Sequence, residues 1–233
     1  MFDLEYLPTG ITADMVGAIN ERLPGLHARK VPSIDTNPGT EEKSAVNWAR
    51  LYLQTHIRRS LSLIEGGYIE WKAGRTIVSS LCTRTLLEDA AVFHYFIEKL
   101  TTLLKEGDWD TIRAFVSSRT FSNKRPLGVD TLGVTIDTTN IVTFIGKMNK
   151  FNSGFSSLYD DLSEVCHPNG IGVMLYFGAF QDNDTITFDD GEKQSHAAIG
   201  HLLAATYLFI CIMPELEALE ELLARSYDAS PVQ

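Results

Sequence analysis

The sequence has few cysteines, and the three that it contains lie far apart. Cys82, Cys166 and Cys211 are odd in number and sit within apolar, helix-like patterns. This arrangement is typical of reduced core residues and excludes a dense disulfide framework. No two of these cysteines have the spacing of a metal-binding pair, so no metal site is predicted, and no cofactor is expected.

The sequence also lacks the features of membrane-spanning and secreted chains. Its longest apolar run, 202–213, has 12 residues, whereas a membrane span needs about 20. Residues 1–10 contain neither the basic nor the apolar region of a signal peptide. We therefore predict that 202–213 is a buried core helix, and we expect no membrane association and a cytoplasmic location.

Positive charge is scarce, because the formal net charge is −10. This balance argues against a general nucleic-acid coat protein, whose affinity comes from cations that neutralise phosphates. The exception is 111–159, which has six basic residues and only two acidic ones. The basic residues are the candidates for contact with RNA: Arg113, Arg119, Lys124, Arg125, Lys147 and Lys150.

Proline is uncommon and helical periodicity dominates, which predicts a mainly α fold. We expect a helical bundle at 40–233 with a small β-hairpin inserted before the last long helix, and a 1–39 extension that packs on its body. Hairpin strands are predicted at 173–180 and 185–188. Helices are predicted at 13–23, 40–64 (ended by Gly66 and Gly67), 68–106, 109–118, 139–149, 156–167 and from 194 to about 225, with Pro214 kinking the last one or opening a new helix.

One set of polar residues on two predicted helices is a candidate site. Arg84 and Glu88 are one helical turn apart on the first, and Tyr159, Ser163 and His167 form a stripe on the second. If these ridges face each other, the five residues form a network. A histidine beside a carboxylate and a tyrosine suits acid–base chemistry, whereas a satisfied buried network also fixes helix register without any reaction. Both interpretations stay open, and His56 and His94 are predicted to be packed or surface residues.

Two segments carry a resemblance to a known family. Residues 84–91 (RTLLEDAA) and 159–170 (YDDLSEVCHPNG), the latter followed by an aromatic hairpin and an apolar helix, resemble a group of bacterial helical proteins that are similar to the HEPN superfamily (higher eukaryotes and prokaryotes nucleotide-binding). The resemblance implies a helical bundle that often dimerises. It also implies relatives that include metal-independent ribonucleases of toxin–antitoxin, phage-defence and RNA-processing systems.

The chain departs from the catalytic signature of that superfamily, an arginine followed by four to six residues and a histidine. Positions 160–162, where the arginine would precede His167, are Asp, Asp and Leu. Arg22 with His27 and Arg50 with His56 fit the spacing, but outside the segments that carry the resemblance.

Three functions follow as expectations. The first is a non-catalytic or regulatory member of a stress, defence or toxin–antitoxin system, with a protein partner or a second copy of itself. The second is an RNA-binding protein or metal-independent endoribonuclease that uses His167 with Arg84. The third is a bundle that binds a nucleotide or another small molecule between its helices.

Overall fold

The computed structural model describes residues 2–36, 38–120, 140–181, 185–191 and 194–229. The predicted mainly α class is confirmed, with a two-stranded antiparallel hairpin before the last two helices. The α-helices in these ranges are α1 (Ala13–Ala28), α2 (Glu41–Lys72), α3 (Thr76–Glu106), α4 (Trp109–Thr120), α5 (Ile141–Phe151), α6 (Phe155–Cys166), α7 (Ser195–Ile210) and α8 (Met213–Ala229). A short π-helix, η2 (Gly170–Leu175), and strands β1 (Gly178–Phe180) and β2 (Ile186–Phe188) lie between α6 and α7.

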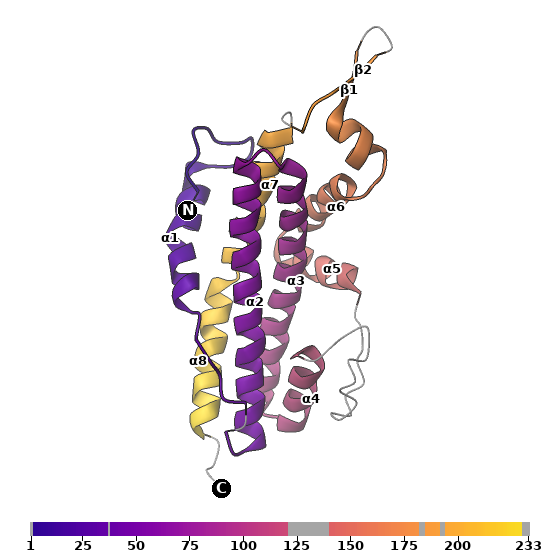
Figure 1. Cartoon of the computed structure of the whole chain (residues 1–233). Helices are drawn as coiled ribbons and strands as arrows, with labels where there is room; N and C mark the ends of the chain where they lie inside the picture. The colour runs from indigo at the N-terminus through magenta and orange to yellow at the C-terminus, as the bar shows by residue number, and fades with distance from the viewer. Residues whose placement is uncertain (1, 37, 121–139, 182–184, 192–193, 230–233) are drawn as a thin grey trace.

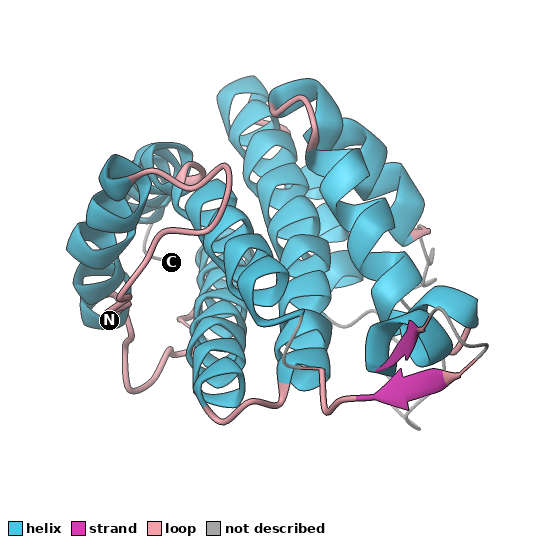
Figure 2. Cartoon of the chain, turned by 90° about the horizontal axis from the view of Figure 1, so that it is seen from above, coloured by secondary structure: helices cyan, strands magenta, loops and turns pink. Residues whose placement is uncertain are grey.

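The long helix α3 is the centre of the bundle. It packs against α2, α4, α5, α6, α7 and α8. Figure 1 shows α2 and α3 upright and side by side, with α1 and α8 on one side and α4, α5 and α6 on the other. Figure 2 shows the same arrangement from above, with the hairpin at the edge of the bundle. Side chains that α3 projects in different directions therefore face different partner helices.

The hydrophobic core is one contiguous cluster that includes residues of α1 as well as of the bundle. Four phenylalanines are among the largest fully buried side chains: Phe93, Phe96, Phe155 and Phe209. Helix α7 contributes a buried face, and its apolar run belongs to the core as predicted. The segment Ser195–Ala229 is apolar and long enough to cross a membrane by composition alone, but 61% of its most apolar window is buried inside the protein.

The predicted break between the first two long helices was wrong. Helix α2 continues through Gly66 and Gly67 to Lys72. A β-carbon at Gly67 would lie 3.1 Å from a methyl group of Leu202, so this position allows α7 to approach α2 closely. The chain turns at Gly74 instead, where φ is +76°, a conformation that glycine adopts without steric cost.

Other predicted boundaries moved for local reasons. Asp108 caps the start of α4, because its carboxylate accepts from the Thr111 backbone N–H at 3.1 Å. Helix α6 begins one residue earlier than predicted, after the N-cap Gly154, which makes no side-chain cap hydrogen bond. Residues 173–175, predicted as the start of the first strand, belong to η2, so β1 is much shorter than 173–180. Pro214 lies in the first turn of α8 and opens a new helix.

Candidate functional site

The candidate site lies where α3 faces α6. On α3, Arg84 and Glu88 are one turn apart, and on α6, Tyr159 and Ser163 have the same spacing. The two helices pack directly against each other. The structure therefore brings four of the five predicted residues into one network.

The Arg84 guanidinium is the centre of this network. Its Nε donates to the Ser163 hydroxyl at 3.1 Å, and its Nη2 donates to the Tyr159 hydroxyl at 2.9 Å. The same Nη2 lies 3.1 Å from the Glu88 Oε1 atom, and the Tyr159 hydroxyl donates to that oxygen, also at 3.1 Å. The guanidinium carbon is 5.2 Å from the centroid of the Tyr159 ring, a cation–π distance. The Nε and Nη2 contacts together fix the position of the Arg84 guanidinium.

The network is partly shielded from water. The Arg84 and Glu88 side chains are 25% and 27% exposed, and Tyr159 is buried. Nearby, burial raises the pKa of the Cys166 thiol to about 11, with smaller opposing effects from Arg84 and Glu88. Because the charges of Arg84 and Glu88 offset each other, the cluster has no net charge.

The fifth predicted residue, His167, does not join the network. It is the C-cap of α6, with an extended backbone and an exposed side chain. Its backbone N–H donates to the Ser163 carbonyl at 3.0 Å, but its imidazole makes no hydrogen bond or ion pair with the residues that the structure describes. The reason is local: the residue before a proline is pushed out of the helical conformation, so Pro168 turns His167 away from the Tyr159–Ser163 stripe.

The predicted basic residues do not form one free patch. Arg113 is paired with Glu41 and Asp110. The Arg119 guanidinium lies between 5.5 and 5.8 Å from the rings of three aromatic residues: Tyr95, Phe115 and Phe144. Lys124 and Arg125 lie outside the described residues.

The two basic residues of α5 are more accessible. Lys147 and Lys150 are both exposed. The Lys147 ammonium lies 3.9 Å from the centroid of the Tyr95 ring, and both lysines line a cleft of about 700 Å³ between α3, α5 and α8. Among the predicted basic residues that the structure describes, these two are the exposed ones.

Sequence reasoning missed a second polar cluster, centred on Asp89. This side chain is only 3% exposed, and its carboxylate lies 2.7 Å from Nδ1 of His56. It also accepts a hydrogen bond from Ser60 and lies 3.4 Å from Nε of Arg59. The sequence feature that could have predicted this cluster is a charged residue beside the apolar stripe of α3. His56 and Ser60, which lie opposite it, are one turn apart on α2. Such a carboxylate must find buried partners.

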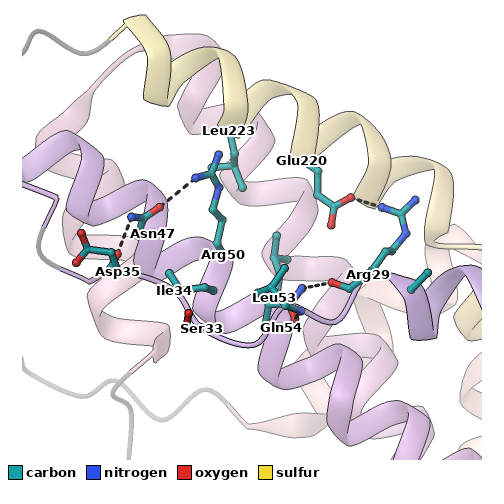
Figure 3. A pocket seen from close by; sticks show the side chains of 12 residues that line it. Arg29, Ser33, Ile34, Asp35, Asn47, Arg50, Leu53, Gln54, Glu220 and Leu223 are labelled. Atoms are coloured by element: carbon teal, nitrogen blue, oxygen red, sulfur yellow. Dashed lines mark hydrogen bonds and ion pairs between the residues drawn. The ribbon is translucent and has the colours of Figure 1, made fainter.

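A cleft of about 610 Å³ lies between α2, α8 and the segment that follows α1. Figure 3 shows Arg50 reaching from α2 toward Leu223 of α8, and its guanidinium donates to Asn47 at 3.1 Å. The segment is held through its backbone, because Gln54 donates to the Arg29 carbonyl at 2.8 Å. Burial raises the pKa of Glu220 in this cleft, and the charge of Arg29 partly opposes the effect. The cleft has the size and mixed polarity of a small-molecule site.

Within the described residues, no group of three histidine, cysteine, aspartate or glutamate side chains is placed to hold a metal ion. Comparisons with family models, with curated proteins and with solved structures found no match to this chain.

Proposed function

We propose that the protein is a non-catalytic, regulatory helical module of a stress, defence or toxin–antitoxin system, acting in the cytoplasm. The observation that carries this proposal is the state of Arg84. An arginine that holds a substrate phosphate needs a charge that no carboxylate already neutralises, and it must lie beside the residue that transfers the proton. Here Arg84 donates to Ser163 and Tyr159 and is paired with Glu88.

The position of His167 supports the same proposal. Its imidazole is exposed and lies outside the network that Arg84, Glu88, Tyr159 and Ser163 form. The Arg84 network is then a clamp between α3 and α6, and it fixes the helix that leads into η2 and the hairpin. Catalysis by His167 with Arg84 has no geometric support of this kind.

An RNA-cleavage assay tests the proposal. Wild type and His167→Ala are incubated with total RNA without added metal, and thermal unfolding of both proteins is measured in parallel. We expect no cleavage above background in either protein and nearly equal unfolding temperatures. Cleavage by the wild type that is lost in His167→Ala, with the fold intact, would contradict the proposal.

A second candidate function, binding of a nucleotide or other anionic small molecule, is favoured by the cleft in Figure 3. Arg50 offers it a cation that donates to Asn47, lies over the Tyr227 ring and interacts electrostatically with Glu220 in the same cleft. Thermal shifts with ATP, GTP and AMP test this function. Stabilisation that Arg50→Met abolishes would support it, and the absence of any shift at millimolar nucleotide would rule it out for these ligands.

A further inference from the structure

The β-hairpin carries an exposed aromatic face. Phe180 and Phe188 are 66% and 76% exposed, the highest values among the large apolar residues that the structure describes. The strand register pairs Gly178 with Phe188 and Phe180 with Ile186. Residues opposite each other in antiparallel strands point to the same side, so both phenylalanines lie on one face as diagonal neighbours. An exposed aromatic pair of this kind is typical of an interaction surface.

The base of the hairpin is held by the body of the protein. The Asp189 backbone N–H donates to the Phe177 carbonyl at 2.9 Å, and the Thr76 hydroxyl donates to the Gly191 carbonyl at 3.2 Å. Thr76 is the first residue of α3, so the hairpin is fixed to that end of the bundle. Figure 1 shows the strands projecting beyond the helices. The aromatic face is thus presented in a defined position, which lowers the entropic cost of docking.

The cleft between α3, α5 and α8 complements this face. Its volume of about 700 Å³ has room for two aromatic rings, and its apolar wall includes Ile97 and Phe151. Lys147 and Lys150 line it and match the negative charge of Asp189 and the exposed Asp190 next to Phe188. Two carboxylates also line the cleft: Glu215, paired with His94 at 3.2 Å, and Glu98.

A hairpin cannot reach the cleft of its own chain. Ile97 lies 21 residues beyond Thr76 along α3, which corresponds to about 32 Å at 1.5 Å per residue. The strands have three residues each and project away from the helices. The chain therefore carries two complementary surfaces that meet only between molecules.

We propose that the aromatic face of the hairpin docks in the α3/α5/α8 cleft of a second copy of the chain, and that the second copy returns the same contact. A two-fold axis that sets the α3 helices antiparallel produces both contacts and closes the assembly as a dimer. Phe180 and Phe188 of both copies, at about 200 Å² each and at their observed exposure, together contribute roughly half of the buried surface. With an equal area of the two clefts, the dimer buries roughly 1,100 Å². This area is at the low end for specific interfaces, so we expect a dimer that dissociates at micromolar concentration. The proposal concerns self-association and does not depend on the proposed regulatory function.

Sedimentation velocity on the full chain from about 1 to 300 µM tests the proposal. The wild type should change from the 25.9 kDa monomer to twice that mass as concentration rises. Phe180→Ser with Phe188→Ser, and separately Lys147→Glu with Lys150→Glu, should each weaken dimerisation by at least about tenfold. Val31→Ser, which removes an exposed apolar side chain from a different surface, should leave it unchanged.

A charge exchange makes the test specific. Two variant proteins are prepared: Asp190→Lys, and the double variant Lys147→Glu with Lys150→Glu. Each variant by itself places like charges at the contact. A mixture of the two variants restores opposite charges at both contacts. We expect the mixture to form a heterodimer under conditions where each variant alone is monomeric. The proposal is overturned by a monomer at all concentrations, by a dimer that survives both sets of substitutions, or by a mixture that does not associate.

Discussion

Arg84→Met should destabilise the protein because it removes the centre of the clamp between α3 and α6. The substitution keeps most of the aliphatic stem but removes the hydrogen bonds to Ser163 and Tyr159, the cation–π contact and the ion pair with Glu88. Hydrogen bonds from a charged donor are worth about 1.5–3 kcal/mol when buried, and these are partly exposed, so we expect a loss of about 2–3 kcal/mol. For a chain of 233 residues this lowers Tm by roughly 4–12 °C.

A double-mutant cycle with Tyr159→Phe measures the coupling directly. Urea unfolding followed by circular dichroism gives the free energy of unfolding for the wild type, both single variants and the double variant. Because the two side chains share hydrogen bonds, the double variant should lose about 1 kcal/mol less than the sum of the single losses. His167→Ala, just after the end of α6, is the control and should change stability by less than about 0.5 kcal/mol. Additive effects of Arg84→Met and Tyr159→Phe, or a large effect of His167→Ala, would refute this account of the network.

Three further predictions test other parts of the structure. Gly66→Ala should stabilise the protein by about 0.5–1 kcal/mol, because the position is helical and a β-carbon meets no neighbouring atom there. Gly74→Ala should destabilise it by about 1 kcal/mol, because φ is positive at that position. Equal effects of the two substitutions in urea unfolding would contradict a chain turn at Gly74. Cys166, with a pKa of about 11, should react at pH 8 about 10-fold more slowly than an ordinary thiol with a pKa of 9.0. The thiolate fraction is about 100-fold lower, and the higher nucleophilicity of the more basic thiolate raises the rate again by about 10-fold. Mass spectrometry of iodoacetamide-treated protein measures this, and labelling at the ordinary rate would contradict it. Because the pKa of Glu220 is raised in the folded state, the folded protein binds more protons than the unfolded one, and stability should fall as pH rises from 4.5 through the raised pKa. Glu220→Gln should flatten this dependence of stability on pH. An unchanged dependence would show that another group causes it.

The fold class was accessible from the sequence because helical periodicity is a local property. The stripes of α2 and α3, the cap at Asp108 and the new helix at Pro214 depend on residues within one or two turns. The break between α2 and α3 was not accessible, because Gly67 serves the approach of Leu202 from more than 130 residues away. A glycine pair alone does not distinguish a helix end from a close helix contact.

The candidate site was predictable only in part. Spacing on single helices correctly grouped Arg84 with Glu88 and Tyr159 with Ser163, but only the packing of α3 against α6 brought the pairs together. The prediction for His167 was wrong because Pro168 forces the residue before it into an extended conformation, so the helical spacing from Tyr159 and Ser163 does not continue to it. The cluster at Asp89 was not predictable from the spacing along α3, because its partners come from another helix.

The sequence by itself determined the helices, the hairpin and the acidic balance, since each arises from interactions between near neighbours or from composition. Tertiary structure alone decided that Arg84 is neutralised by its partners, that His167 faces solvent, and that the aromatic face of the hairpin lies far from the cleft it complements. The physical reason is that charge pairing, exposure and reach depend on which helix faces lie within a few ångströms of each other, and no local pattern encodes those distances.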